Sequence, residues 1–129
     1  MNLLLDTHAL LWVMANDPRV RSQTLAALRS PDNQVYVSAA SGWEIAIKVG
    51  LGKLRVPADV ADWLPAELDY HRFSRLPIQL EHVLAVEHLP PHHRDPFDRL
   101  LIAQAQVEAF TLVTRDRQFR AYPVRTMPC

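Results

Sequence analysis

The chain has 129 residues, of which 49% are hydrophobic and 22% are charged, and this predicts one globular domain over residues 1–129. Its apolar runs are too short to cross a bilayer, its start lacks the basic residues and cleavage site of a signal peptide, and the single Cys129 excludes an internal disulfide. These features favour a cytoplasmic protein.

The formal net charge is zero, but the charges are unevenly distributed. Residues 56–90 carry six acids against two arginines, whereas residues 91–129 carry six arginines against four acids. Arginine guanidinium groups suit phosphate recognition, yet the same distribution also fits a surface that only keeps the protein soluble. Charge alone leaves both interpretations open.

The apolar pattern predicts alternating strands and helices. In chain order these are a strand over 2–7, helices over 8–15 and 17–30, a strand over 34–38, helices over 39–54 and 56–68, a strand over 73–78, helices over 79–89 and 95–109, a strand over 111–114 and an edge strand over 124–127. Asp17 and Pro18 open the second helix, Ser38 caps the third, and Pro65 cuts the fourth.

Strands separated by helices predict an α/β fold in which a parallel sheet is covered on both faces. In such a sheet the strand-to-helix junctions gather at one edge, where ligands bind. Acids follow this pattern: Asp6 ends the first strand, Glu44 lies early in the helix after the second, and Asp116 lies two residues beyond the last buried strand. Asp98, in the first turn of the helix before that strand, faces the same edge if its loop returns there.

Four carboxylates in one cleft repel one another, so their pKa values rise or a multivalent cation neutralises them. Ligation by Asp and Glu oxygens alone favours Mg²⁺ or Mn²⁺ over zinc. Such a site suits phosphodiester hydrolysis, because one metal activates water and a second, about 4 Å away, stabilises the leaving oxygen.

Four segments together resemble a PIN domain, in particular the VapC-type toxins of bacterial toxin–antitoxin pairs. The segments are LLLDTHALLW, SAASGWEIAIK, HHRDPFDRLLIAQA and LVTRD, and the resemblance spans nearly the whole chain. It implies a three-layer α/β/α fold with parallel strand order 3-2-1-4-5. It also implies cleavage of RNA with Mg²⁺ or Mn²⁺, and a small antitoxin protein as partner; we also expect a homodimer.

By this resemblance the acidic quartet of catalytic metal ligands is Asp6, Glu44, Asp98 and Asp116. Asp95, Thr7 and Thr114 are expected as supporting residues, and the expected RNA contacts are Arg94, Arg99, Arg115 and His93. Asp95 matches a position often acidic in the family.

Each of these residues also has a purely structural interpretation. Asp95 is a good N-cap, Pro96 suits the first helical position, and Asp98 stands where a capping-box acid would reach back. Asp6 alone could be an acid satisfied by backbone amides, and Glu44 could pair with Lys48 on the solvent face. Thr7 and Thr114 could hydrogen-bond metal-bound water or be ordinary strand threonines.

The histidines and tryptophans indicate less about function than the acidic residues do. His88, His92 and His93 crowd one loop, but prolines there prevent the helical spacing that a zinc site needs. His8 could pack beside the first strand. The remaining aromatic residues of note, Trp12, Trp43 and Trp63, lie on apolar helix faces, which favours core or partner-groove positions over base stacking.

Two other functions fit part of the pattern. A haloacid-dehalogenase-like phosphatase also begins with an Asp after an apolar strand, but it needs a second Asp where this chain has His8. A noncatalytic Mg²⁺-binding α/β module, such as a receiver domain, needs a lysine after a late strand, whereas the only lysines here are Lys48 and Lys53.

Overall fold

The computed structural model describes residues 1–129 and contains one parallel sheet of five strands in the order β3-β2-β1-β4-β5. The strands are β1 (Asn2–Leu5), β2 (Gln34–Ser38), β3 (Ser74–Leu76), β4 (Thr111–Thr114) and β5 (Thr126–Pro128). In the central strand β1, Leu3 pairs with Val35 of β2 on one side and with Thr111 of β4 on the other. The predicted α/β class and strand order are confirmed.

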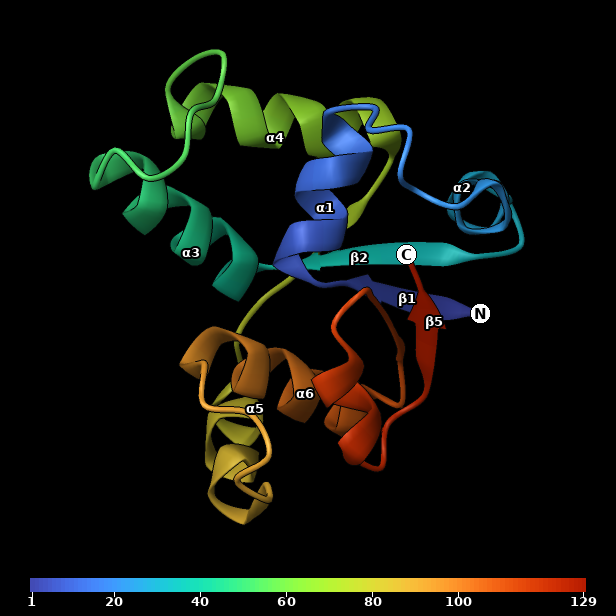
Figure 1. The fold of residues 1–129 in the computed structure, drawn as a ribbon, viewed down its shortest axis with the longest axis vertical. Helices are drawn as coiled ribbons and strands as arrows, with labels where there is room; N and C mark the ends of the chain where they lie inside the picture. Colours follow the sequence, from blue (N-terminus) through green and yellow to red (C-terminus); the bar gives the residue numbers. More distant parts are fainter.

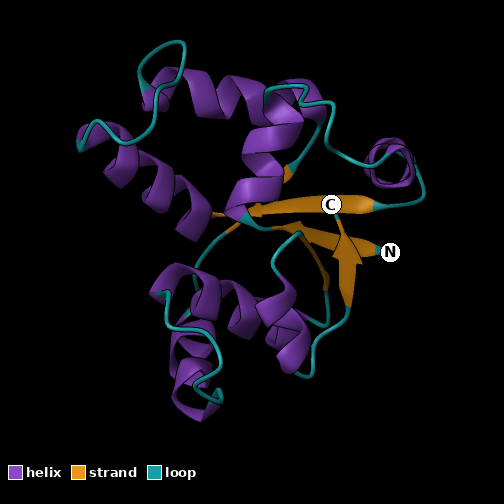
Figure 2. Ribbon diagram, in the orientation of Figure 1, coloured by secondary structure: helices purple, strands orange, loops and turns teal.

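Helices cover both faces of this sheet, which gives the three-layer arrangement seen in Figures 1 and 2. They are α1 (Thr7–Met14), α2 (Ser22–Arg29), α3 (Ala39–Gly50), α4 (Val60–His71), α5 (Leu80–Ala85) and α6 (Pro96–Glu108), with 3-10 turns η1 (Val86–His88) and η2 (Arg117–Ala121). Helices α1 to α4 lie on one face, and α5, α6 and η2 lie on the other. No helix is both long and apolar enough to span a bilayer.

The alternation of side chains along β1 divides the core into two parts. Leu3 and Leu5 belong to the cluster under α1 to α4, whereas Leu4 belongs to the cluster under α5 and α6. All three leucines are fully buried. A continuous apolar strand with both faces covered is the pattern expected of a central parallel strand, and it fixes the position of the acid that follows it.

Several predicted helix boundaries were wrong; the helix predicted over 56–68, for example, begins only at Val60. Residues 17–21 form a turn because the Asp17 carboxylate accepts hydrogen bonds from the backbone and side chain of Arg19, so α2 begins only at Ser22. Helix α3 ends at Gly50, before Gly52 takes a left-handed φ of 72°. Pro65 lies inside α4 without ending it.

The helix continues past Pro65 because Leu64 and Leu68, on either side of the proline, are buried in the core. This packing offsets the one hydrogen bond that a proline nitrogen cannot donate. The predicted Ser38 cap is confirmed, since its hydroxyl accepts a 3.0 Å hydrogen bond from the Ala40 backbone N–H.

Candidate metal centre

The four predicted acids come from four different segments of the chain and lie at the carboxyl edge of the sheet. Asp6 is the N-cap of α1, Glu44 lies in the second turn of α3, Asp98 in the first turn of α6, and Asp116 in the turn between β4 and η2. The charges of Glu44 and Asp6 both act on the Asp98 carboxyl, and the charge of Asp116 acts on Asp6. The structure thus brings the four carboxyl groups into one electrostatic group.

Asp6 is held by two donors. Its Oδ1 accepts a 2.7 Å hydrogen bond from the Ala9 N–H at the start of α1, and its Oδ2 accepts from the Thr114 hydroxyl at the end of β4. Thr114 Oγ1 in turn accepts a 3.0 Å hydrogen bond from the Asp116 N–H. One threonine therefore orients two of the acids, which is a positioning role that its strand location alone did not reveal.

Glu44 carries the most informative atom of the site. The side chain is buried and Oε2 accepts a 2.6 Å charged hydrogen bond from Lys48, so the predicted i,i+4 pair exists, but not on the solvent face. Oε1 is buried and has no hydrogen-bond partner. An unpaired buried carboxylate oxygen costs about 1–3 kcal/mol, and a bound cation would satisfy it.

The neighbours Asp95 and Asp98 have different roles in the helix. Asp95 Oδ1 accepts hydrogen bonds from the N–H groups of Phe97 (2.8 Å) and Asp98 (3.1 Å), and Pro96 begins α6. The N-cap interpretation of Asp95 is confirmed. Asp98 does not reach back to the cap; its Oδ2 lies 3.1 Å from His93 Nε2.

His93 joins two acids of the site. Its Nε2 lies 2.9 Å from Asp116 Oδ2 as well as 3.1 Å from Asp98 Oδ2, and its Nδ1 accepts a 3.2 Å hydrogen bond from the Asp95 N–H. Because Nδ1 accepts, Nε2 carries the ring proton and donates it toward these oxygens. A cation bound by Asp98 and Asp116 would compete with this N–H group.

The crowding of the acids changes their proton affinities. Burial, the charge of Asp95, and the charges of Glu44 and Asp6 raise the pKa of Asp98 to about 7, against a lowering by His93. Burial and the charge of Asp116 also raise the pKa of Asp6, although its hydrogen bonds from Thr114 and Ala9 oppose the shift. Raised carboxyl pKa values at one locus are typical of functional sites.

The predicted RNA contacts differ in their surroundings. Arg94 and Arg115 are exposed and form no ion pair. Arg99 donates instead to loop carbonyl oxygens, including those of Pro90 at 2.9 Å and Leu89 at 3.2 Å, so its guanidinium holds the loop before α6. Arg99 therefore has a structural role in this loop, and its contact with RNA stays a prediction.

His93 and Thr7, two further predicted residues, each contact another side chain in the structure. His93 contacts Asp98 and Asp116, and its contact with RNA stays a prediction. Thr7 donates a 3.0 Å hydrogen bond to the Ser41 hydroxyl and thereby links the first turns of α1 and α3. Neither role has a sequence signal, because both depend on residues that are far apart in the chain.

The structure also brings together residues that the sequence analysis considered separately. A hollow of about 390 Å³ is lined by the acids Asp6 and Asp116 and by His8, Trp12, Arg19 and Arg115. His8 and Trp12 lie four residues apart on α1, and this i,i+4 spacing could have indicated one shared face. No sequence pattern indicated that Arg19 lies beside the acids, because residues 17–21 were predicted to be helical.

A second His–acid cluster, near α5, consists of Glu81, His82 and Glu108. His82 is completely buried; its Nδ1 accepts a 2.9 Å hydrogen bond from the Gln79 N–H, and its Nε2 lies 2.9 Å from Glu108 Oε1. Because Nδ1 accepts, Nε2 carries the ring proton and donates it to Glu108. His88 and His92 belong to neither cluster.

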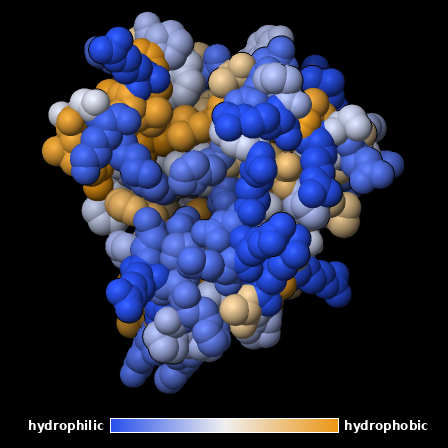
Figure 3. Space-filling model, in the orientation of Figure 1, coloured by the Kyte–Doolittle hydropathy of each residue, from blue (hydrophilic) through white to orange (hydrophobic).

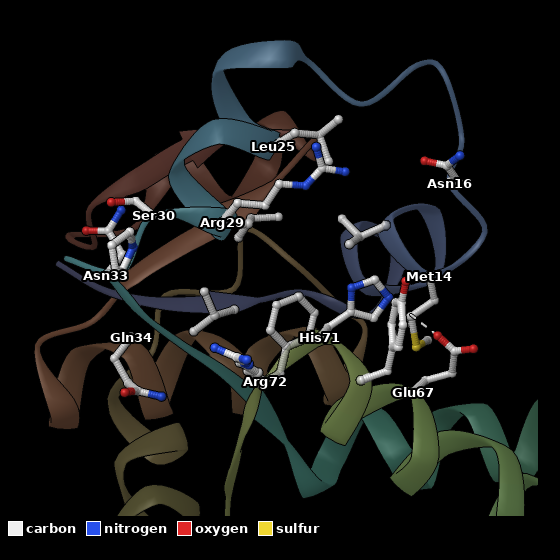
Figure 4. Close-up of a pocket in the computed structure, with 16 residues that line it drawn as sticks. Met14, Asn16, Leu25, Arg29, Ser30, Asn33, Gln34, Glu67, His71 and Arg72 are labelled. Carbon is white, nitrogen blue, oxygen red and sulfur yellow. Dashed lines mark ion pairs between the residues drawn. The ribbon is translucent and has the colours of Figure 1, made fainter.

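Another cavity lies away from the acids. It measures about 1030 Å³ and is bounded by the end of α1, by α2, by the start of β2 and by the end of α4 (Figure 4). Its apolar residues include Val13, Leu25 and Phe73, and Arg29 and the ion pair of Glu67 with His71 (3.4 Å) lie among its polar residues.

Comparison with known proteins gives matches over nearly the full chain. The chain is 28% identical over 120 residues to Ribonuclease VapC22 of Mycobacterium tuberculosis, covering 93% of this chain and 91% of that protein. Its fold matches VapBC2 from Rickettsia felis bound to a promoter DNA fragment, with a TM-score of 0.77 at 18% identity and coverage of 100% and 99%. It also matches a toxin–antitoxin complex from Klebsiella pneumoniae, with a TM-score of 0.61 at 17% identity and coverage of 94% and 92%.

At such low identity the two solved structures establish the fold alone. The family assignment rests on a separate observation, because residues 3–124 match the PIN domain family. This range contains all four acids and Thr114. The chain is a member of the PIN domain family.

Proposed function

We propose that this protein is a Mg²⁺- or Mn²⁺-dependent endoribonuclease and the toxin of a toxin–antitoxin pair. The observation that carries the proposal is the group of four carboxyl groups in which one buried oxygen, Glu44 Oε1, has no partner. The relative VapC22 is named a ribonuclease, which supports RNA as the substrate. PIN family membership argues against the phosphatase and receiver alternatives.

The residues present fit a hard divalent cation. Asp6, Glu44, Asp98 and Asp116 would hold it through carboxylate oxygens, the ligands that Mg²⁺ and Mn²⁺ prefer. When bound, the cation lowers the pKa of a water nucleophile and neutralises charge on the phosphodiester.

The protein groups prepare this site. Thr114 orients Asp6 and the backbone of Asp116, and the Ala9 N–H at the start of α1 fixes the other oxygen of Asp6. Lys48 holds Oε2 of Glu44 so that Oε1 is the oxygen left for a ligand. Arg94 and Arg115 are exposed near the acids in sequence and supply donors for RNA phosphates.

The first prediction concerns metal binding and cleavage. Asp6→Asn should reduce Mn²⁺ affinity at least about tenfold and abolish cleavage of labelled RNA, because a carboxylate ligand is lost. Thermal stability of the metal-free protein should stay the same or rise, since one buried charge is removed. Titration calorimetry, a cleavage assay with Mn²⁺ with and without chelator, and thermal melts measure the three effects.

Asp32→Asn is the matched control, because Asp32 is exposed in the turn between α2 and β2. It should leave both metal affinity and cleavage unchanged. Wild-type Mn²⁺ affinity in Asp6→Asn would count decisively against the metal site.

The second prediction separates the cap from the ligand. Asp95→Ala should lower the free energy of unfolding by about 1 kcal/mol while metal binding largely survives, because two backbone donors of α6 lose their acceptor. Asp98→Ala should cost little stability yet remove cleavage. Thermal melts and RNA cleavage on both variants decide; an active, less stable Asp98→Ala protein would assign Asp98 to the helix rather than to the site.

The third prediction is a pH dependence of the metal-free protein. Because the folded-state pKa of Asp98 is raised to about 7, its proton stabilises the folded state fully below the unfolded pKa of about 3.9, and this stability is lost as the pH rises to about 7. The free energy of unfolding should therefore fall by about 1–2 kcal/mol between about pH 5 and pH 7 and then level off.

Denaturant unfolding in the presence of chelator measures this dependence. Asp98→Asn should flatten the curve over the same interval, since its side chain does not titrate. An Asp98→Asn curve parallel to that of the wild type would show that Asp98 does not titrate there.

The antitoxin partner is proposed to fill the large cavity between α1, α2 and α4. Both apolar and charged residues line this cavity (Figure 4), which suits an amphipathic segment in the helix-in-groove mode. In Figure 3 apolar surface also gathers over α3 and α4, where Trp43 is 59% exposed. We propose this second surface as the contact of the homodimer. The surface over α5 and α6 in that view is largely hydrophilic.

The fourth prediction tests this partner site. Co-expression with the small protein encoded beside its gene should give a complex on size exclusion and suppress RNA cleavage. Leu25→Asp should weaken that complex at least about tenfold, because it puts a charge among the apolar residues that line the cavity. It should leave RNA cleavage intact. Gln23→Glu, an exposed change on the same helix outside the cavity, is the control; an unaltered complex with Leu25→Asp would exclude this cavity as the partner site.

A further inference from the structure

Two arginines converge on one tryptophan beside the acids. The guanidinium carbon of Arg19 lies 4.0 Å from the Trp12 ring centroid, and that of Arg115 lies 4.3 Å from it. Trp12 is half-buried and packs against the core cluster under α1 to α4, so it is a fixed support for both groups. Cation–π contacts of this kind stabilise a guanidinium in one orientation.

Arg19 is further oriented by Asp17. Its Nε lies 3.1 Å from Asp17 Oδ1 and its Nη2 lies 2.8 Å from Oδ2, a bidentate pair. The hydrogen bonds from Arg19 lower the pKa of Asp17 to about 2, and the charge of Arg115 contributes to the same shift. Asp17 therefore compensates one of the two positive charges at Trp12, and the second is left without a partner.

Arg115 has no carboxylate within ion-pair distance, although its neighbour in the chain is Asp116. The hollow of about 390 Å³ thus has two chemically different walls. Asp6 and Asp116 form an acidic wall suited to a cation, and Arg19 and Arg115 form a basic wall supported by Trp12. A ligand that joins a metal-bound phosphate to a further anionic group matches both walls.

We propose that Arg19, Trp12 and Arg115 form a subsite for the RNA nucleotide next to the scissile phosphodiester, with the guanidinium groups binding its backbone phosphate. This rests on the proposed nuclease function. Arg19 and Arg115 act as phosphate ligands, and Trp12 and Asp17 act as positioning residues that hold the donors before RNA arrives. Phosphate contacts carry no base information, so the subsite binds RNA of any sequence.

The test measures RNA binding separately from cleavage. A fluorescein-labelled single-stranded RNA of about ten nucleotides is titrated by fluorescence anisotropy in chelator, at several salt concentrations and with two unrelated sequences. Arg19→Gln and Arg115→Gln should each raise Kd about three- to tenfold for both sequences, and each should reduce the slope of log Kd against log salt by about 0.7.

Arg21→Gln is the matched control, because Arg21 is exposed two residues from Arg19 and does not line the hollow. It should bind RNA as the wild type does. Arg115→Lys keeps the charge and should retain the wild-type salt slope. Trp12→Leu, which keeps an apolar side chain against the core, should raise Kd without changing the slope, since both charges remain.

Cleavage by the wild type in Mn²⁺ distinguishes this proposal from the nuclease function on which it rests. If the wild type cleaves RNA but the two glutamine variants keep its Kd, KM and salt slope, the subsite is refuted and the nuclease stands. If the wild type neither cleaves nor binds RNA, both proposals fall. Weaker binding of the partner protein together with unchanged RNA binding would reassign the two arginines to the partner interface and overturn the subsite.

Discussion

The hydrogen bond between Thr114 and Asp6 is the contact on which the arrangement of the site depends. It joins residues 108 positions apart and exists only because β1 and β4 are neighbours in the sheet. Asp6 also caps α1, so one carboxyl group connects the sheet centre, the first helix and, through Thr114, the turn that carries Asp116. A shift in the pairing of β1 with β4 would separate all three.

The fold stabilises a site that is unfavourable by itself. A buried glutamate with an unpartnered oxygen and two aspartates with raised pKa values lower the stability of the folded chain when no cation is bound. The opposing contribution comes from β1, whose three consecutive leucines are buried in both halves of the core. The fully buried leucines of β1 are therefore followed directly by a buried acid, Asp6.

The sequence predicted what depends on local pattern and topology. The run of leucines in β1, the strand-to-helix junctions and the Asp95 cap are readable because periodicity and turn chemistry act over a few residues. The continuation of α4 past Pro65 could not be predicted, because tertiary packing outweighed local propensity. The turn at Asp17 could not be predicted either, because it depends on the side-chain pair of Asp17 with Arg19. The contacts of His93, Arg99 and Thr114 were unpredictable for another reason: each partner lies on a distant segment or in an irregular loop.

The zero net charge conceals a strong local separation of charge. Within one hollow, acids that fit a cation face arginines that fit a phosphate, and they alternate along the chain at Arg115 and Asp116. The side chains of adjacent residues in a turn project in different directions, so one peptide unit places Arg115 in the basic wall and Asp116 in the acidic wall. Because the acids repel RNA and the arginines attract it, the proposed RNA binding without metal depends on the basic wall, whereas the proposed cleavage depends on an acidic wall neutralised by a cation. In this proposal the order of the two residues in the turn sets the position of the substrate relative to the metal.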